Sequence, residues 1–392
     1  MIESAIFKDE SKLMPEYVPD SLPFREPQLR QLIAIYKGML EAPGSAFYKA
    51  IAYGPVGTGK TAVSKRFGKM LEEKAAKRGV DIRYIHVNCY RDRTLFMVAK
   101  RIARTLDPKF PVRGYSAQEF LEMAWGYLED QEAYAFIVID EFDYIARAAP
   151  ESIYIFTRLS DPYLQVEQRV SMLFVVRDIS FLYMLDRSLT STLQRNIIEF
   201  KPYTSKQLAK ILEERAEEAF KPGAVSQEVV NFIAMLAGID GEGNGDARYA
   251  LELLWRAGKY AELDEADKVK PEHVRRATHD IHPGVRAEEL ANLTKHELIL
   301  LLALAESLKS TEAAYVRLVD VERSYRSICE SMGLKPRRHT QVWEYVKRLK
   351  NMGFITARVG PLGRKRGRTT FLGLSGIPAS MLERKVRNML GW

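Results

Sequence analysis

The sequence decides its fold at residues 54–61, which read Gly54-Pro55-Val56-Gly57-Thr58-Gly59-Lys60-Thr61. This is the pattern G-x-x-x-x-G-K-T, in which glycines let backbone N–H groups wrap around an anion. An apolar stretch over residues 47–53 precedes it and predicts a strand. An amphipathic stretch over residues 60–78 follows it and predicts a helix whose N-terminus faces the anion. These residues therefore predict a phosphate-binding loop.

The chemistry of that loop points to a nucleoside triphosphate. Lys60 is expected to reach the β- and γ-phosphates, and Thr61 is expected to ligate Mg²⁺. Further along, residues 136–141 form an apolar strand pattern that ends in Asp140 and Glu141. Such a strand places Asp140 beside the loop, where it is expected to hold Mg²⁺ through water, and Glu141 where a water-activating base is needed. The cofactors expected are ATP or ADP with Mg²⁺.

The rest of the first half alternates between strand and helix patterns. Further strands are expected over residues 81–88, 170–177 and 196–200. Strands that alternate with helices predict a mostly parallel sheet covered on both faces. From residue 204 the pattern turns helical and predicts a small lid, with a Gly-rich break over residues 238–245. Arg248 lies at the start of the helix after that break. Taken alone it is interpreted as a surface charge, and a contact with a γ-phosphate is the alternative.

Charge separates the last part of the chain from the remainder. The 392 residues carry a net +8, and residues 285–392 hold 20 Lys and Arg against 10 Asp and Glu. That segment is therefore near +10 and the remainder near −2, which is typical of a nucleic-acid-binding module on a neutral body. The two cysteines, Cys89 and Cys329, predict free thiols in a reducing compartment. No signal segment or membrane span is expected, and we expect a cytoplasmic, nucleoid-associated protein without a membrane partner.

The basic segment predicts a winged helix-turn-helix. A capping box at Thr294 to Glu297 opens its first helix, a second helix is expected over residues 320–332, and a third over residues 338–353. A hairpin with a basic tip follows. The third helix is expected to enter the major groove and the tip to contact phosphates. A winged helix that binds protein is the alternative, which the basic tip disfavours. The DNA-binding candidates are Gln341, Lys347, Arg348, Arg364, Lys365, Arg366 and Arg368.

The order of several motifs resembles that of the archaeal origin-recognition initiator family, which are AAA+ relatives of the eukaryotic origin recognition complex. The motifs are Pro23-Phe24-Arg25-Glu26, the phosphate loop, His86-Val87-Asn88-Cys89, Ile139-Asp140-Glu141-Phe142-Asp143, Phe200-Lys201-Pro202-Tyr203-Thr204, Arg215 and Gly245-Asp246-Ala247-Arg248. The resemblance implies an α/β AAA+ P-loop core, a helical lid and a C-terminal winged helix. The domains would be residues 1–20 (an irregular, extended arm), 21–203 (core), 204–284 (lid) and 285–392 (winged helix).

The resemblance also implies roles for residues outside the phosphate loop. Tyr203 and Arg215 would line the adenine side of the nucleotide, and Arg248 would be the sensor-2 arginine. Arg25 and Ala62 would join the loop in binding nucleotide. Arg113 would lie in a helical insertion through which the AAA+ body touches DNA.

The function implied is a replication initiator with slow ATP turnover. It would bind double-stranded origin DNA under the control of ATP or ADP, and help recruit the replicative helicase, alongside other initiator paralogues. Two departures stand against efficient hydrolysis. Arg177 takes the place of the usual sensor-1 Asn. The box that supplies the arginine finger, Leu-Asp-Pro-Arg in the family, reads Leu185-Asp186-Arg187-Ser188 here, so Arg187 or Arg195 would have to act as the finger. The alternatives are a transposition- or restriction-type AAA+ ATPase, a nucleotide-sensing regulator that loads no helicase, and a protein-remodelling ATPase.

Overall fold

A computed structural model describes most of the chain and divides it into two compact units. The residues that it describes are 4–148, 155–156, 168–180, 182, 196–281, 290–361 and 368–392. One unit, the core unit, consists of Pro15–Gln207 with Asn244–Ala247. The other, the lid–wing unit, consists of Met1–Met14, Leu208–Gly243 and Arg248–Trp392. No described helix is both long enough and apolar enough to cross a lipid bilayer.

The core unit is built on a five-stranded parallel sheet. Its strands are β1 (Lys49–Tyr53), β2 (Ile82–Asn88), β3 (Tyr134–Asp140), β4 (Val170–Val176) and β5 (Ile197–Glu199). They lie in the order β2-β3-β4-β1-β5, with every adjacent pair parallel. Every residue of β4 is buried, as a parallel strand covered on both faces requires. The sheet predicted from the sequence is confirmed.

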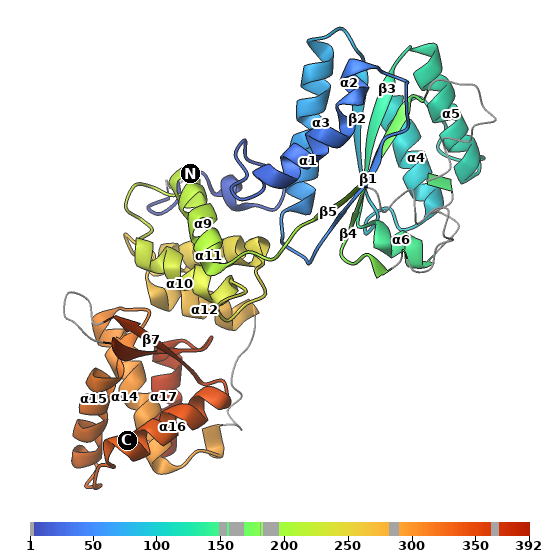
Figure 1. Cartoon of the computed structure of the whole chain (residues 1–392). Helices are drawn as coiled ribbons and strands as arrows, with labels where there is room; N and C mark the ends of the chain where they lie inside the picture. The colour runs from blue at the N-terminus through green and yellow to red at the C-terminus, as the bar shows by residue number, and fades with distance from the viewer. Residues whose placement is uncertain are drawn as a thin grey trace. The chain divides into compact units, whose positions relative to one another are not determined.

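Helices cover both faces of this sheet (Figure 1). Among the described residues the helices of the unit are α1 (Glu26–Tyr36), α2 (Gly38–Glu41), α3 (Lys60–Ala76), α4 (Leu95–Leu106), α5 (Ala117–Asp130) and α6 (Phe142–Ala148). One face packs against α1 and α3, where the rings of Tyr36, Phe67 and Phe136 lie 4.9 to 5.5 Å apart. The other face packs against α4, α5 and α6. Two apolar layers thus fix the carboxyl ends of the strands, where the site forms.

The lid consists of four helices and carries the N-terminal arm. The helices are α9 (Ser205–Ala219), α10 (Gln227–Ala237), α11 (Ala247–Leu263) and α12 (Pro271–Ile281). The arm was expected to be irregular and extended across the body. Instead it contains a 3₁₀ helix, η1 (Glu10–Leu13), and Phe7 pairs with Phe220 beyond α9. Ile6 and Phe7 are buried there. Burial of these two adjacent apolar side chains stabilises the docked position of the otherwise polar arm.

The winged domain has more elements than the sequence predicted. They are α14 (Lys295–Thr311), β6 (Val316–Arg317), α15 (Leu318–Ser331), α16 (His339–Asn351), β7 (Ile355–Pro361), β8 (Arg368–Leu374) and α17 (Ala379–Leu390). The expected capping box forms between Thr294 and Glu297. β6 joins the hairpin in a three-stranded sheet of order β6-β8-β7. The added helix α17 buries Leu382 and Val386 against the domain core.

Candidate functional site

The phosphate-binding loop leaves β1 and enters α3 through glycines in unusual conformations. Gly57 and Gly59 have φ values of 71° and 88°, in the left-handed region that side chains disfavour. A Cβ on Gly57 would also collide with the Asp246 carboxylate. The loop therefore needs glycine for both its backbone shape and its close neighbours. α3 begins at Lys60, so its N-terminal N–H groups face the loop.

Lys60 closes the loop from inside. Its side chain is 8 % exposed, and its Nζ donates to the carbonyl oxygens of Gly54 (2.5 Å) and Pro55 (2.7 Å). The Thr58 hydroxyl also donates to Pro55, at 2.8 Å. Val56 is exposed at the tip of the loop. A buried ammonium beside the helix N-terminus suits a phosphate anion.

The structure brings the two predicted metal ligands together. The Thr61 hydroxyl donates to Asp140 Oδ2 at 2.8 Å, and Asp140 is 1 % exposed at the end of β3. Burial opposes ionisation of Asp140. Hydrogen bonds from His86, Thr61 and the Glu141 backbone nevertheless hold its pKa below the ordinary value. A hydroxyl beside an ionised carboxylate is the oxygen donor set that Mg²⁺ prefers, so these residues fit that ion.

Sequence reasoning missed the role of His86 at this position. Its Nε2 lies 3.3 Å from Asp140 Oδ2, and its Nδ1 lies 3.0 Å from the Tyr84 hydroxyl. Tyr84 lies two positions before His86 on the same strand, and Asp140 is brought close because β2 pairs with β3 and places Asn88 opposite Asp140. His86 is thus placed to orient the Asp140 carboxylate towards Thr61. The alternating pattern of β2 predicted a strand, but it did not predict that this strand pairs with β3.

The candidate base is paired with Arg177, the residue at the expected sensor-1 position. Arg177 Nη2 donates to Glu141 Oε1 at 2.9 Å, and this bond raises the pKa of Arg177. Glu141 itself has a φ of 54°, a strained value for a side chain of this size. The altered arginine-finger residues, 185–188 and 195, lie outside the described residues.

Arg25 and Tyr203 brace the loop from the other side. Arg25 donates to the carbonyl oxygens of Thr58 (2.8 Å) and Lys201 (2.7 Å), and its guanidinium lies 3.8 Å from the centre of the Tyr203 ring. Burial is the largest cause of the lowered pKa of Arg25 and of the raised pKa of Tyr203. Arg25 therefore ties the phosphate loop to the segment after β5. Three of its N–H groups are bonded to backbone carbonyl oxygens and its guanidinium lies over the Tyr203 ring, so the contacts of Arg25 hold the loop in place.

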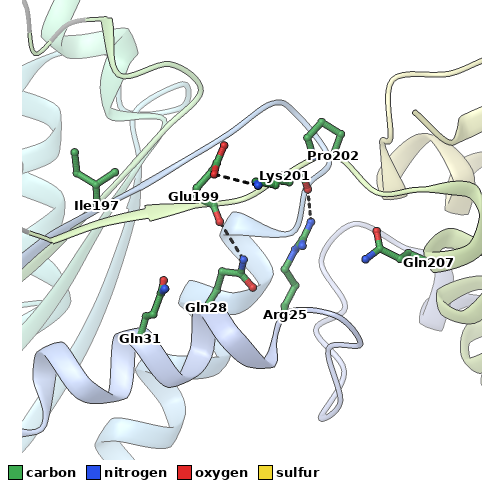
Figure 2. Close-up of a pocket in the computed structure, with 8 residues that line it drawn as sticks. All are labelled: Arg25, Gln28, Gln31, Ile197, Glu199, Lys201, Pro202 and Gln207. Atoms are coloured by element: carbon green, nitrogen blue, oxygen red, sulfur yellow. Dashed lines mark hydrogen bonds and ion pairs between the residues drawn. The ribbon is translucent and has the colours of Figure 1, made fainter. Parts of the chain in front are cut away.

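A polar pocket of about 400 Å³ lies beside this brace (Figure 2). Its lining residues are Arg25, Gln28, Gln31, Ile197, Glu199, Lys201, Pro202 and Gln207. Gln28 donates to the Glu199 carbonyl at 3.0 Å and so covers the edge of β5. None of the residues of the phosphate loop lines this pocket, so it is distinct from the phosphate site.

Ala62 lies in the first turn of α3, and the last two nucleotide candidates belong to the lid–wing unit. Arg215 on α9 donates to the Lys12 carbonyl at 3.4 Å and pairs with Glu218, which fastens the arm to the lid. Arg248 lies in the first turn of α11. The loop just before it belongs to the core unit, where Ala247 N donates to the Gly57 carbonyl at 3.1 Å. The approach of Arg215 and Arg248 to a nucleotide stays a prediction.

The DNA candidates that the structure describes are all exposed, and two of them also form ion pairs. Gln341 on α16, Arg368 at the start of β8 and Arg113 in the loop before α5 are exposed. Lys347 pairs with Glu344 at 2.9 Å on the surface of α16. Arg348 lies 3.1 Å from Glu297, which is fully buried. The hairpin-tip residues 364–366 lie outside the described residues.

The start of α16 carries basic residues that sequence reasoning passed over. Arg337, Arg338, His339 and Thr340 are all exposed there, directly before Gln341. The N-terminal residues of a recognition helix are those that reach base edges. The run from Lys335 to His339 was a signal for them, since it places Lys335, Arg337 and Arg338 at the start of a predicted helix.

Comparisons with known proteins agree with this architecture. Residues 49–185 match an AAA domain, residues 209–279 the Cdc6 AAA+ ATPase-type lid domain, and residues 288–384 the CDC6 C-terminal winged helix domain. The ORC1-type DNA replication protein 2 of Sulfurisphaera tokodaii is 37% identical over 390 residues, which cover 98% of this chain and 93% of that protein.

Solved structures give the same result over nearly the whole chain. Cdc6p from Pyrobaculum aerophilum matches with a TM-score of 0.85 and 30% identity, covering 98% of this chain and 99% of that one. The Aeropyrum pernix ORC1 protein, solved in complex with DNA, matches with a TM-score of 0.65 and 31% identity, covering 99% and 98%. The resemblance and the fold class expected from the sequence are confirmed. The chain therefore belongs to the ORC1/Cdc6-type family of DNA replication proteins.

Proposed function

We propose that this chain is a replication initiator that binds double-stranded origin DNA in a manner set by ATP or ADP. The observation that carries the proposal is the presence of two different sites in one chain. One is a phosphate loop whose Thr61 lies 2.8 Å from Asp140, and the other is an exposed basic surface at the start of α16. The relative from Aeropyrum pernix, solved in complex with DNA, supports the second site.

In this proposal the core unit binds the nucleotide and hydrolyses it slowly. Lys60 and the backbone of residues 54–61 hold the phosphates, while Thr61 and Asp140 hold Mg²⁺. The ion supplies charge that offsets the phosphate oxygens. Glu141 takes a proton from the attacking water. Tyr203 of the core unit and Arg215 of the lid line the adenine side of the nucleotide, and Arg248 contacts its γ-phosphate.

The winged domain and the AAA+ insertion both bind the same DNA duplex in this proposal. Residues at the start of α16 read base edges, while the wing beginning at Arg368 and the insertion loop around Arg113 contact phosphates. The chain would bind one DNA segment through both regions. The nucleotide state would then change the DNA complex by setting the angle between the AAA+ body and the winged domain. Other initiator paralogues and the replicative helicase are the proposed partners on origin DNA.

DNase footprinting on the chain's own origin DNA tests the proposal, with ADP and with a non-hydrolysable ATP analogue. We expect protection of short repeats that is lost when Arg337 and Arg338 are both replaced by Ala. Replacing Lys74 and Lys77, exposed at the C-terminal end of α3 in the core, removes the same charge and is expected to leave the footprint intact. Normal nucleotide binding without any specific footprint would contradict the proposal.

A second candidate is a nucleotide-sensing regulator that binds DNA but recruits no helicase. The pairing of Arg177 with Glu141, at the position of the usual sensor-1 amide, favours it over an active hydrolysis cycle. Retention of purified replicative helicase on origin DNA separates the two. Retention that depends on the chain supports the initiator, whereas tight DNA binding without retention supports the regulator. Family membership argues against a transposition- or restriction-type enzyme.

A further inference from the structure

Arg177 and Glu141 meet because their strands are neighbours. β3 pairs with β4 in parallel, so the residues that follow these strands project from the same edge of the sheet. Arg177 follows β4 and Glu141 follows β3. Their ion pair, 2.9 Å long, spans the edge at which the phosphate loop also ends. The Arg177 side chain is 53% exposed and that of Glu141 is 26% exposed, so solvent reaches the pair.

The backbone of Glu141 is fixed on both sides of this contact. Its N–H donates to Asp140 Oδ1 at 2.9 Å, and its carbonyl accepts from Tyr144 N at 3.0 Å at the start of α6. Asp143, on the same helix, accepts from the backbone N–H of Arg177 at 3.4 Å. Since the backbone is held, the direction of the Glu141 carboxylate depends on its χ angles and on Arg177.

We propose that Arg177 is a positioning residue that slows ATP hydrolysis by holding the Glu141 carboxylate away from the attacking water. The proposal rests on the hydrolytic role given to Glu141 above. In that reaction a water oxygen forms a bond to the γ-phosphorus, and the bond from the γ-phosphorus to the β,γ-bridging oxygen breaks. Glu141 accepts a proton from the water and later releases it to phosphate or solvent.

An arginine and an amide differ at this position in their charge. Arginine is permanently charged and matches a carboxylate with its planar donors, whereas an Asn or Gln side chain has no charge to pair with Glu141. A general base must bring an oxygen within about 2.6–3.2 Å of the proton that it takes. Arg177 occupies Oε1 of Glu141, so the base has to leave this ion pair or act through its other oxygen.

The size of the effect follows from the exposure of the pair. An exposed ion pair stabilises a given geometry only weakly, which limits the gain from breaking it to about fivefold in rate. Salt screens such a pair. Raising the salt concentration is therefore expected to speed hydrolysis by the unaltered protein more than by a variant without the pair.

The test replaces Arg177 in the full chain by Asn and, separately, by Gln. We expect kcat at saturating ATP to rise about two- to fivefold in both variants, with the Kd for nucleotide unchanged and the gain with salt abolished. The matched control is Arg83→Asn, since Arg83 forms a similar pair with Asp81 (2.7 Å) at the opposite edge of the same sheet. That control should leave kcat unchanged.

A second measurement needs no turnover. The thermal unfolding of nucleotide-free protein is compared among Arg177→Gln, Glu141→Gln and the double variant. If the two residues stabilise each other, each single change lowers Tm by up to about 3 °C and the double change lowers it no further. Additive changes, or no change, would overturn the proposed restraint.

The outcomes separate this proposal from the one on which it rests. An Arg177 variant that binds nucleotide normally but turns over no faster, or more slowly, overturns the restraint and leaves the nucleotide site in place. A chain that binds no nucleotide in any form overturns both. Faster turnover that persists in the additional presence of Glu141→Gln would also overturn the restraint, because the gain would not pass through Glu141.

Discussion

In the phosphate site the functional side chains are buried and bonded to one another, whereas on α16 they are exposed and spread along a surface. Lys60 and Asp140 are 8 % and 1 % exposed, and each has partners within 2.8 Å. Arg337, Arg338 and Gln341 are all exposed. A site of the first kind is pre-organised, so one change there should be severe. A surface of the second kind adds many small charge contacts, so single changes there should be graded.

The largest effect is expected from Asp140→Asn. This change keeps the shape but removes the charge beside Thr61 and His86, so we expect ATP hydrolysis to fall by about 10²- to 10³-fold. Steady-state ATPase assays measure it. Glu199→Gln is the matched control, because Glu199 ends β5 of the same sheet and lines the separate pocket beside Arg25. Equal activity of Asp140→Asn and the unaltered chain would refute the pre-organised metal site.

A smaller, graded effect is expected on α16. Replacing Arg337 and Arg338 by Ala removes two charges, so the slope of log Kd against log salt should become shallower by about 1.8. Affinity for origin DNA should fall by about 10- to 100-fold at physiological salt. Fluorescence anisotropy over a salt series measures both. An unchanged slope would show that these residues do not contact DNA.

Arg348 is exposed on α16 like the DNA candidates, but it is also paired with a buried carboxylate. It was predicted to bind DNA, yet it lies 3.1 Å from the buried Glu297. Arg348→Ala should therefore lower the free energy of unfolding by about 1–3 kcal/mol, because a buried carboxylate loses its counter-charge. Denaturant unfolding measures it, with Lys347→Ala as the exposed neighbour. Unchanged stability with weaker DNA binding would return Arg348 to the DNA surface.

The smallest effect is expected at His273 in the lid. Burial lowers the pKa of His273, and its Nδ1 accepts from Lys270 N at 3.0 Å. Below about pH 6.5 the unfolded chain takes up a proton that the folded chain resists. Stability should therefore fall as pH falls through that value, and less so in His273→Gln. The fall is measured as the change in Tm from pH 8 to pH 5 for the unaltered chain and for His273→Gln. Equal slopes of Tm against pH in the two proteins would show that groups other than His273 cause the acid sensitivity.

Local motifs predicted the phosphate loop, the sheet and the winged domain, because each depends on residues that are close in sequence. The pairing of His86 with Asp140 was not predictable in this way, since it depends on β2 and β3 lying side by side. β6 escaped prediction because two residues are too short for a pattern.

Other parts escaped because their apolar signal was sparse. α17 lies in a basic stretch with a thin apolar stripe, and its packing on α14 is a tertiary effect. The arm looked polar, although Ile6, Phe7 and Leu13 are buried in it. The ion pair between Arg348 and Glu297 was not predictable, because the two residues are 51 positions apart in the sequence. The sequence indicated only a helix-capping role for Glu297.

The central claim is that the nucleotide bound in the core sets the affinity of the chain for origin DNA. The most direct measurement is the Kd for one origin duplex at fixed salt, with ADP and with a non-hydrolysable ATP analogue, for the unaltered chain and for Lys60→Ala. The account predicts at least about a fivefold difference between the two nucleotides in the unaltered chain, and none in Lys60→Ala. Equal affinities with both nucleotides in the unaltered chain, with each nucleotide bound, would contradict it.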